Sequence, residues 1–422
     1  MNIIKQNIAV VGAGVAGITA AYLLQQKHNV TIFDKNDYLG GHTNTIVISD
    51  GVDAGTAVDT GFIVLNDATY PAFHRLLERL NVPVRNSDMS FGFHCEKTGL
   101  QYCGDNFNTL FAQRKNFFKP SHWKMLSDVV KFGNIARSGL KQGNIDSDTV
   151  GEFLKKYQFS TSFIENYLLP MGAAIWSTPT REMMRFPAKT FLQFFDNHGL
   201  LSRKPPQWQT VVGGSHSYIK SFTKQFQGEI FLNHAVQHVL RNDNSVALEL
   251  SNGESLPFDC VILASHADET FNLLKQPTRD EQRLLGVWKY VNNKAVLHTD
   301  PSVMPSNRRA WASWNYKREN VEDVSDALSM SYDMNRLQGL TTQQNYFVTL
   351  NSHKPIKKEA IIKKIQYMHP FYNFDSVQTQ SELHKLNGIN RTYFCGSYFG
   401  YGFHEDAVKS GVQVARHFGL DL

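Results

Sequence analysis

A glycine-rich turn near the N-terminus is the strongest sign of chemistry in this chain. Gly12, Gly14 and Gly17 are spaced as G-x-G-x-x-G, between an apolar run at residues 8–11 and a helix-forming run at residues 18–26. In such a turn the first glycine permits the tight bend. The second lets the backbone approach a pyrophosphate, and the third lets the helix pack closely on the strand. Because the helix N-terminus also offers free N–H groups, the spacing predicts a dinucleotide-binding turn.

An acidic residue follows this turn at a suitable distance. A second apolar run, at residues 30–33, ends in Asp34. Its carboxylate is expected to accept hydrogen bonds from a ribose hydroxyl. A purely structural glycine turn is the alternative, but strand, turn, helix, strand and acid in this order favour dinucleotide binding. The cofactor contacts expected here are Gly12, Ala13, Gly14, Val15, Ala16, Gly17, Asp34 and Lys35.

A glycine pair lies shortly after the acid. Gly40 and Gly41 make a second place where backbone can approach a ligand closely, although an ordinary loop is the alternative. With the first turn, this stretch resembles the N-terminus of the flavin-containing amine oxidase superfamily. The resemblance implies FAD as the cofactor, with contacts at Gly40, Gly41, His42 and Thr43. That superfamily usually has arginines where this chain has Tyr38 and His42, which argues against a plain amine oxidase and leaves FAD binding intact.

The C-terminal segment resembles the second FAD signature of the same superfamily. Residues 392–397 predict a short buried strand, and the segment after Gly402 predicts a helix with apolar positions from Ala407 to Ala415. A final strand and a capped helix without cofactor contacts are the alternative. The resemblance implies that the helix points its N-terminus at the flavin and stabilises negative charge there. It implies contacts at Gly396, Ser397, Gly402, Phe403, His404 and Ala407.

Two middle segments are expected to complete the cofactor domain. A helix is predicted at residues 216–225 and a strand at residues 231–236, followed by a hairpin around Asn252-Gly253. An apolar run at residues 259–264 predicts a buried parallel strand. The resemblance implies that backbone near Val236 meets the adenine end of FAD. Asp59, Thr60 and Gly61, just after the first strands, are further expected contacts.

The expected fold is α/β, with a discontinuous Rossmann-like FAD-binding domain and an α+β substrate domain of the amine oxidase type. The FAD-binding domain is expected to comprise residues 1–75, 205–265 and 385–422. The substrate domain, a helical insertion plus an antiparallel sheet, is expected to comprise residues 76–204 and 266–384. Pro205-Pro206 marks the predicted crossing from the helical insertion back to the cofactor domain.

Four further motifs resemble a bacterial subfamily of FAD-binding oxidoreductases whose genes often lie beside cyclopropane-fatty-acid-synthase-like methyltransferases. The resemblance implies redox chemistry on unsaturated fatty acyl lipids, by desaturation, saturation or double-bond movement. A flavin amine oxidase and a non-catalytic, FAD-bound partner of a lipid methyltransferase are the alternatives. The motifs are Val58–Val64, Leu169–Ser177, Phe195–Leu201 and Tyr401–Asp406.

Composition is that of an ordinary globular protein. The 422 residues are 42% apolar and 19% charged, enough for two domains with real cores. The net charge of +5 comes without a dense basic block, so no nucleic-acid partner is expected. No apolar run approaches the roughly 20 residues that cross a bilayer, and no signal peptide is recognised. The four cysteines lack metal-site spacing, Cys260 and Cys395 are expected in the core, and a cytoplasmic protein without a metal is predicted.

One segment has a more distinctive surface chemistry. Aromatic residues alternate with lysines and arginines between Asn106 and Asn134. Such a segment is able to rest on anionic lipid, which predicts a peripheral contact at the inner membrane face. A helical wall of the substrate domain with a solvated basic face is the preferred alternative.

His404 and Lys294 are the candidate catalysts. The resemblance places His404 at the helix N-terminus beside the flavin, as a donor, a proton relay or a backbone contact only. Lys294 is the nearest equivalent of a lysine that holds a water near flavin N5 in relatives, with an ordinary surface lysine as the alternative. His198, in a turn-like context, is expected to face a cavity.

A flavin transfers electrons itself, so the protein is expected mainly to orient the substrate. Carbon–carbon chemistry calls for a dry apolar channel, and aromatic residues are candidates to line it. Core packing is the alternative for each of them. The candidates are Trp176, Phe186, Phe191, Phe194, Phe195, Trp311, Trp314 and Tyr316.

Overall fold

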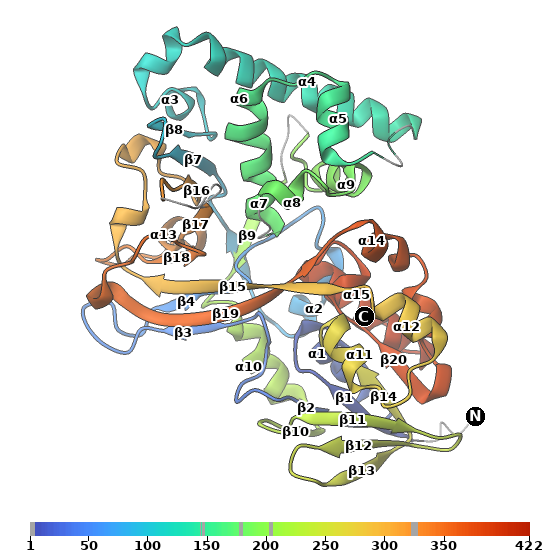
Figure 1. Ribbon diagram of the computed structural model, residues 1–422. Coiled ribbons are helices and arrows are strands. Elements are labelled where there is room, and N and C mark those ends of the chain that lie inside the picture. The colour runs from blue at the N-terminus through green and yellow to red at the C-terminus, as the bar shows by residue number, and fades with distance from the viewer. Residues whose placement is uncertain (1–4, 144, 146–147, 177–179, 202–205, 322–327) are drawn as a thin grey trace.

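The computed structural model describes residues 5–143, 145, 148–176, 180–201, 206–321 and 328–422 (Figure 1). Ser177, in one of the resemblance motifs, and Pro205, at the predicted crossing, lie outside these residues.

A five-stranded parallel sheet carries the glycine-rich turn. All four strand pairs in it are parallel, and β1 lies at its centre, with Ile8 level with Val30 on one side and with Cys260 on the other. These central strands are short, apolar and almost fully buried, as expected of a sheet covered on both faces. The order of strands is β10 (Glu229–Phe231), β2 (Asn29–Phe33), β1 (Asn7–Val11), β14 (Cys260–Leu263) and β20 (Thr392–Phe394).

Two helices from opposite ends of the chain pack on each other beside this sheet. α1 (Val15–Leu24) is apolar and buried over nearly its whole length, and α15 (His404–His417) lies against it. The contact is close, because a Cβ at Gly411 would lie 2.5 Å from the Ala16 carbonyl oxygen. The apolar positions predicted from Ala407 to Ala415 form the buried face of α15. This packing brings both predicted cofactor signatures to one edge of the sheet.

A three-stranded antiparallel sheet follows β10 and lies beyond the parallel sheet in Figure 1. It contains the predicted hairpin, in which β12 and β13 pair across Asn252-Gly253. The strand predicted over residues 231–236 is wrong, because β10 ends at Phe231 and Val236 begins the next strand. Asn233 has a φ of +58° between them, which ends the extended run. The strands are β11 (Val236–Arg241), β12 (Val246–Leu250) and β13 (Ser255–Phe258).

A seven-stranded sheet forms the second large layer. Its longest strands, β15 and β19, pair antiparallel and cross the middle of the molecule in Figure 1. β7 joins the sheet parallel to β16, although more than 200 residues separate them. The order is β19 (Ile361–Phe371), β15 (Lys289–His298), β18 (Phe347–Leu350), β17 (Leu328–Asp333), β16 (Trp314–Arg318), β7 (Phe91–Cys95) and β8 (Leu100–Cys103).

A helical insertion between β8 and β9 covers one end of this sheet, at the top of Figure 1. Its interior is built mainly from phenylalanines, among them Phe132, Phe163 and Phe195. The helices are α3 (Phe107–Leu110), the 3₁₀ helix η1 (Arg114–Phe118), α4 (Pro120–Gln142), α5 (Val150–Lys156), α6 (Thr161–Phe163), the π-helix η2 (Ile164–Leu168), α7 (Leu169–Trp176), α8 (Thr180–Met183) and α9 (Ala188–Asn197). The segment between Asn106 and Asn134 is helical, as predicted, and contains α3, η1 and the first part of α4.

The remaining elements connect these layers. Two small sheets are formed by β3 (Thr45–Val47) with β4 (Ala57–Asp59), and by β5 (Leu65–Asn66), β9 (Trp208–Val211) and β6 (Val84–Asn86). The helices are α2 (Pro71–Arg79), α10 (His216–Gln225), α11 (Ala267–Leu273), α12 (Arg279–Leu285), α13 (Met334–Gln338) and α14 (Phe374–Gln380). Short 3₁₀ helices are η3 (Pro301–Val303), η4 (Arg308–Ala310), η5 (Lys358–Ala360), η6 (Leu383–Leu386), η7 (Ile389–Arg391) and η8 (Ser397–Phe399).

The membership of the sheets agrees with the predicted α/β fold. Every strand of the parallel sheet falls within residues 1–75, 205–265 or 385–422, and every strand of the seven-stranded sheet falls outside them. The domain boundaries themselves stay a prediction. The four cysteines are buried and unpaired, in keeping with a core role. Among the described residues, no helix is both long and apolar enough to span a bilayer.

Candidate active site

A cavity of about 1080 Å³ lies where the parallel sheet, the seven-stranded sheet and the helical insertion meet. Its walls come from segments far apart in the sequence: the glycine-rich turn, the loop after β2, helix α7, strand β19 and the start of α15. The cavity therefore extends from the predicted cofactor signatures at one end to an apolar wall at the other.

The glycine-rich turn has the geometry that its sequence predicts. Gly12 has a φ of +104°, in the region that favours glycine. A Cβ at Gly17 would lie 2.0 Å from the Gly12 carbonyl oxygen, so the helix packs as closely on the strand as expected. A Cβ at Gly14 would meet nothing within 4 Å, because this glycine faces the cavity. The turn therefore leaves open space where a cofactor would pass.

The first turn of α1 offers backbone donors to that space. Its N-cap is Gly14, which has no side chain to cap the helix, and Val15 and Ala16 line the cavity. The first N–H groups of a helix have no partner within it, and they attract anions. This end of the cavity is therefore suited to phosphate groups.

Asp34 and Lys35 lie beside the turn, at the end of β2. The Ala13 N–H donates to Asp34 Oδ2 at 2.7 Å, and the Asn36 N–H donates to Oδ1 at 2.8 Å. These bonds orient the carboxylate, and Asp34 still lines the cavity. Lys35 pairs with Glu269 of α11 at 2.6 Å. The acid is thus placed where a ribose would follow the phosphates.

The loop with the glycine pair closes over the turn. A Cβ at Gly41 would lie 3.3 Å from Gly14 Cα, so the two glycine segments touch. His42 follows, and its Nε2 is buried without a hydrogen-bond partner. The Tyr38 hydroxyl donates to the Gly41 carbonyl at 3.2 Å and so holds the loop. The uncapped start of α1 and the open space at Gly14 suit a pyrophosphate, and the residues present therefore fit FAD.

Most of the predicted cofactor residues lie together on this cavity. Four of them do not line it: Ala13, Gly17, Thr43 and Asp59. Ala13 and Gly17 shape the turn from behind. The lining residues are Gly12, Gly14, Val15, Ala16, Asp34, Lys35, Gly40, Gly41, His42, Thr60, Gly61, Val236, Gly396, Ser397, Gly402, Phe403, His404 and Ala407.

Asp59 is a buried structural carboxylate instead of a direct contact. Its oxygens accept from the Ser215 N–H at 2.8 Å, from the Ser215 hydroxyl at 2.9 Å and from Gln338 Nε2 at 3.0 Å. Burial raises the pKa of Asp59 to about 6. Asp59 therefore joins the turn before α10 to α13.

His404 is the first residue of α15 and lines the cavity. Its Nε2 lies 3.0 Å from the Thr43 hydroxyl, which in turn lies 2.5 Å from the Tyr218 hydroxyl. The imidazole stacks on Phe62 with 3.7 Å between ring centroids. Burial lowers the pKa of His404 to about 3, so the ring is neutral at physiological pH. Thr43, which does not line the cavity, therefore acts by fixing the orientation of His404.

Lys294 is not brought to the cavity. It lies on β15 in a stretch where Asn292 and Lys294 are exposed while Asn293 and Ala295 are buried. The backbone N–H of Lys294 donates to Asn351 Oδ1 at 2.9 Å, which is its contact with the interior. The structure thus corrects the expected place of Lys294 beside the flavin.

A cluster of rings near His42 was not foreseen from the sequence. His266, Tyr290, Tyr367 and His369 all line the cavity around it. His266 caps the start of α11, Tyr290 lies on β15, and Tyr367 and His369 lie on β19, which pairs with β15 over a long range in the sequence. Locally, β15 shows only an alternation of exposed and buried residues. Its register with β19 is also needed to place Tyr290 near Tyr367 and His369.

A family model described as flavin containing amine oxidoreductase matches residues 15–370 of the chain. The chain belongs to this family. It is accordingly an FAD-dependent oxidoreductase. A search of curated proteins finds no match to the chain.

Solved structures of several other enzymes share its fold. A putrescine oxidase mutant matches with a TM-score of 0.70 at 15% identity, covering 98% of both chains. A CLA-producing fatty acid isomerase from P. acnes matches at 0.68 and 15%, covering 98% of this chain and 99% of that one. Cyclohexylamine oxidase from Brevibacterium oxydans matches at 0.70 and 15%, covering 98% and 100%. At such identities the likeness establishes the fold alone.

The far end of the flavoenzyme's cavity is apolar. Met171, Ala174 and Ile175 of α7 line it, together with residues from β7 and from strands β16 to β18. Of the predicted aromatic lining, the residues on the cavity are Trp176, Phe194 and Trp314. The remaining aromatic candidates lie in the core or outside this wall: Phe186, Phe191, Phe195, Trp311 and Tyr316.

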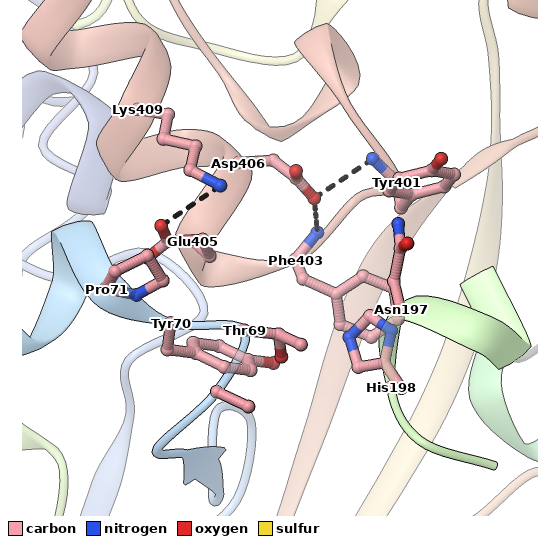
Figure 2. A pocket seen from close by; sticks show the side chains of 11 residues that line it. Thr69, Tyr70, Pro71, Asn197, His198, Tyr401, Phe403, Glu405, Asp406 and Lys409 are labelled. Carbon is pink, nitrogen blue, oxygen red and sulfur yellow. Dashed lines mark hydrogen bonds and ion pairs between the residues drawn. The ribbon is translucent and has the colours of Figure 1, made fainter. Parts of the chain in front are cut away.

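A smaller pocket of about 250 Å³ adjoins the cavity near the start of α15 (Figure 2). The two share Tyr70, His198, Tyr401 and Phe403, so His198 faces a cavity as predicted. Asp406 Oδ2 accepts from the N–H groups of Tyr401 at 3.0 Å and Phe403 at 3.1 Å, which shapes the loop before α15. Burial lowers the pKa of His198 to about 4, so this second ring is also neutral.

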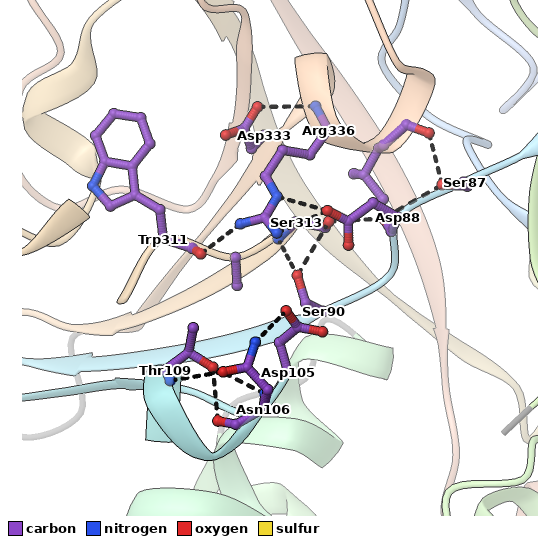
Figure 3. Close-up of polar contacts among 12 residues, drawn as sticks. Ser87, Asp88, Ser90, Asp105, Asn106, Thr109, Trp311, Ser313, Asp333 and Arg336 are labelled. Carbon is purple, nitrogen blue, oxygen red and sulfur yellow. Dashed lines mark hydrogen bonds and ion pairs between the residues drawn. The ribbon is translucent and has the colours of Figure 1, made fainter. Parts of the chain in front are cut away.

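A polar network fixes the apolar wall contributed by the segment before β7 (Figure 3). Arg336 Nε donates to Asp88 at 2.9 Å, and its Nη1 donates to the Trp311 carbonyl at 2.6 Å. The Ser313 N–H donates to the Ser90 hydroxyl at 3.0 Å. Because Met89 lies between two anchored residues, its side chain is held on the flavoenzyme's cavity.

Proposed function

We propose that this FAD-dependent oxidoreductase acts on carbon–carbon bonds of unsaturated fatty acyl lipids, by desaturation, saturation or double-bond movement. The observation that carries the proposal is the distribution of charge in the cavity. Among the described residues that line it, the only carboxylates are Asp34 and Glu269, beside the glycine-rich turn. The apolar end around Met171 and Ile175 has none, and it suits an uncharged hydrocarbon chain.

The protein's part in such a reaction is to bind, orient and desolvate. FAD, when bound, supplies the two-electron chemistry. The apolar wall holds the acyl chain, and the neutral rings of His404 and His198 lie on the cavity as donors or acceptors without bringing a charge. Their roles in moving a proton stay predictions.

Amine oxidation is the second candidate, since two of the similar structures are of oxidases named for amines, putrescine and cyclohexylamine. A diamine has a positive charge at each end and gains from a carboxylate at the distal end of its site. The described lining offers carboxylates only near Lys35, which already neutralises Glu269. A fatty acid isomerase shares the fold equally well. The charge distribution therefore favours the acyl substrate.

The test compares substrates on the purified, FAD-loaded enzyme without oxygen. With oxidised flavin, a monounsaturated phospholipid should bleach the flavin if it is desaturated, or change its double bonds and leave the flavin oxidised if it is isomerised. Saturation consumes two electrons, so a second assay starts from flavin reduced with dithionite, which the lipid should reoxidise. Product analysis by mass spectrometry follows the lipid in both assays. Putrescine and cyclohexylamine should do none of these. Flavin reduction or peroxide release with the amines and an unchanged lipid would overturn the proposal. No reaction with either would favour a non-catalytic partner of a lipid methyltransferase, an association that stays a prediction.

A matched pair of variants links the activity to the cavity. Ala174→Phe fills the apolar end, so it should leave FAD binding intact and reduce lipid turnover at least about tenfold, because overpacked sites lose their ligand. Ala54→Phe, at an exposed site off the cavity, should change neither quantity. Equal turnover in the two variants would show that the acyl chain does not lie along α7.

We further propose that this enzyme reaches its lipid from a membrane surface through α3, η1 and the start of α4. Phe118 is 83% exposed and Phe107 61%, an unusual exposure for rings of this size. Residues 106–127 contain no aspartate or glutamate, and four cations lie among the exposed rings. These cations are Arg114, Lys115, Lys119 and Lys124. Charge complementarity therefore favours an anionic lipid surface as the occupant.

Sedimentation with vesicles tests this contact. The protein should bind vesicles of phosphatidylglycerol, bind phosphatidylcholine weakly, and be released by salt. Phe118→Ser should lower the bound fraction several-fold, whereas Ile389→Ser, an exposed apolar residue elsewhere, should not. Binding that ignores both lipid charge and Phe118 would contradict the contact and would leave the acyl-lipid proposal to its own test.

A further inference from the structure

Three imidazoles gather on the cavity from three separate elements. The ring centroid of His42 lies 5.4 Å from that of His369 and 5.9 Å from that of His266. Tyr367 stacks on His42 at 5.1 Å, and Tyr290 stacks on His266 at 4.4 Å, so tyrosines frame the group. We call His42, His266 and His369 the imidazole cluster. All three line the cavity.

The imidazole cluster borders the phosphate end of the cavity. His42 directly follows Gly41, which touches Gly14 of the glycine-rich turn. His266 follows Ser265, whose backbone nitrogen would lie 3.1 Å from a Cβ at Gly12. Two of the rings are therefore tethered to backbone that contacts the turn from opposite sides.

In the neutral ring of His42, Nε2 carries no proton and so has none to donate. Its ring is hydrogen-bonded to the Met368 backbone, and its Nε2 has no partner. The bond to a backbone carbonyl uses the Nδ1 proton, so neutral Nε2 presents a lone pair. A lone pair repels a phosphate oxygen, and only the protonated ring donates from Nε2.

The tautomer of His369 is set by a chain of amides. The Lys294 N–H donates to Asn351 Oδ1 at 2.9 Å, which turns Asn351 Nδ2 toward Asn293 Oδ1, at 2.6 Å. Asn293 Nδ2 then donates to His369 Nδ1 at 2.8 Å. The neutral His369 therefore carries its proton on Nε2 and is already a donor.

Without a ligand, the imidazole cluster is able to take up a proton, because His42 and His369 are uncharged. Burial and the neighbouring imidazoles lower the pKa of His42 and of His369, so without a ligand both rings are neutral at physiological pH. Glu269 lies 3.9 Å from His266 Nδ1 but is paired with Lys35. The other titratable groups that face the cluster are Asp34, Asp268, Tyr38, Tyr290, Tyr367 and His404.

We propose that the imidazole cluster is a proton-linked anion subsite, which takes up a proton as the pyrophosphate of FAD binds and donates to it through His42 Nε2. In this chain an inducible charge then stands at the position where related enzymes usually have the fixed charge of an arginine. The proposal rests on FAD as the cofactor and not on the acyl substrate, so the two fail separately.

Linkage gives the sign of the effect. Bound phosphate raises the pKa of the cluster, so binding is tightest below the pKa of the free state and weakens as pH rises from that value to the pKa of the bound state. Between these two values, the affinity falls by up to about tenfold for each unit by which the pH rises, because one proton is taken up on binding. Since the pKa of His42 in the free state is well below 6.5, the dissociation constant of FAD should already rise with pH below 6.5, and it should level off above the pKa of the bound state.

Calorimetric titration of the FAD-free protein, in buffers of different ionisation enthalpy, measures the protons taken up. FAD and ADP should each cause uptake, since both bring a pyrophosphate, and riboflavin should cause none. His42→Gln should lose most of the uptake and bind FAD about tenfold more weakly at pH 6. His42→Arg should bind tightly with little dependence on pH. His353→Gln, at an exposed loop residue, should behave as the wild type.

Circular dichroism of each variant checks that it folds, and the wild-type protein alone already tests the linkage. A flat pH profile with no buffer dependence in the wild type would overturn the proposal. So would equal proton uptake in the wild type and both His42 variants, because the protons would then go to another group. The lipid and amine assays play no part in this result.

Discussion

Two histidines on the cavity are held neutral by burial, through different partners. His404 is bonded to Thr43 and stacked on Phe62, whereas His198 lies 3.0 Å from the Phe194 carbonyl through Nδ1. A neutral imidazole donates from one nitrogen and accepts at the other, so it serves as a polar contact without bringing a net charge. Neither ring is therefore an acid in its charged form near neutral pH.

The buried ring of His404 should make folding sensitive to acid. Its pKa is about 3 in the folded protein and about 6.5 when exposed, so its contribution is complete above pH 6.5 and is lost as pH falls toward 3. Between pH 7 and pH 5 the wild type should lose about 2 kcal/mol relative to His404→Gln. Urea unfolding of both proteins at the two pH values measures this difference. The contributions of the other histidines are the same in both proteins and cancel in the comparison. A difference that does not change with pH would show that His404 is solvated.

The packing of α1 on α15 sets the position of the glycine-rich turn. A Cβ at Gly411 would meet the Ala16 carbonyl oxygen at 2.5 Å and Thr19 Cβ at 3.1 Å. Backbone cannot give way as a flexible side chain does, so any substitution moves one helix against the other. Ala16 itself lines the cavity, and the cofactor site would move with it.

Gly411→Ala should therefore cost about 1–3 kcal/mol of folding stability and weaken FAD binding, although alanine is the better helix former. Gly133→Ala is the matched control on α4, where the nearest atom to the new Cβ is 3.6 Å away. It should gain up to about 1 kcal/mol and leave FAD affinity unchanged. Urea unfolding and quenching of flavin fluorescence give both quantities. Equal stability and equal FAD affinity of the two variants would mean that α1 is able to shift away from α15 without disturbing the cofactor site.

The elements of the site differ in how far the sequence predicts them. The glycine-rich turn, Asp34 and α15 follow from local rules, because a turn, an acid and an amphipathic helix need only their own neighbours. The position of Lys294 depends on the register of β15 with β19, which pairs residues such as Lys294 and Gln366 that are far apart in the sequence. The imidazole cluster joins three segments that are equally remote from one another in the chain. Asp59 shows a third limit: its type and place suit a ligand contact, and only the structure shows it bonded to Ser215.

At the scale of the whole molecule, the cavity joins parts that are remote in the chain. The two glycine segments, β11, the loop before α15 and β19 all line it. The unfolded chain does not bring these segments together, so FAD binds the folded state alone. The cofactor is therefore expected to act as a noncovalent brace between the parallel sheet and the seven-stranded sheet.

Saturating FAD should accordingly raise the free energy of unfolding by about 2.7 kcal/mol at a free concentration 100 times the dissociation constant. Urea unfolding followed by tryptophan fluorescence, with and without FAD, measures the gain. Repeating the measurement with riboflavin and with ADP shows how much of the gain in free energy of unfolding comes from each end of the cavity. ADP should supply a share, since the turn, Asp34 and His42 lie at the phosphate end. A stabilisation by FAD no larger than that by riboflavin would mean that the glycine-rich turn, despite its geometry, contributes nothing to holding the cofactor.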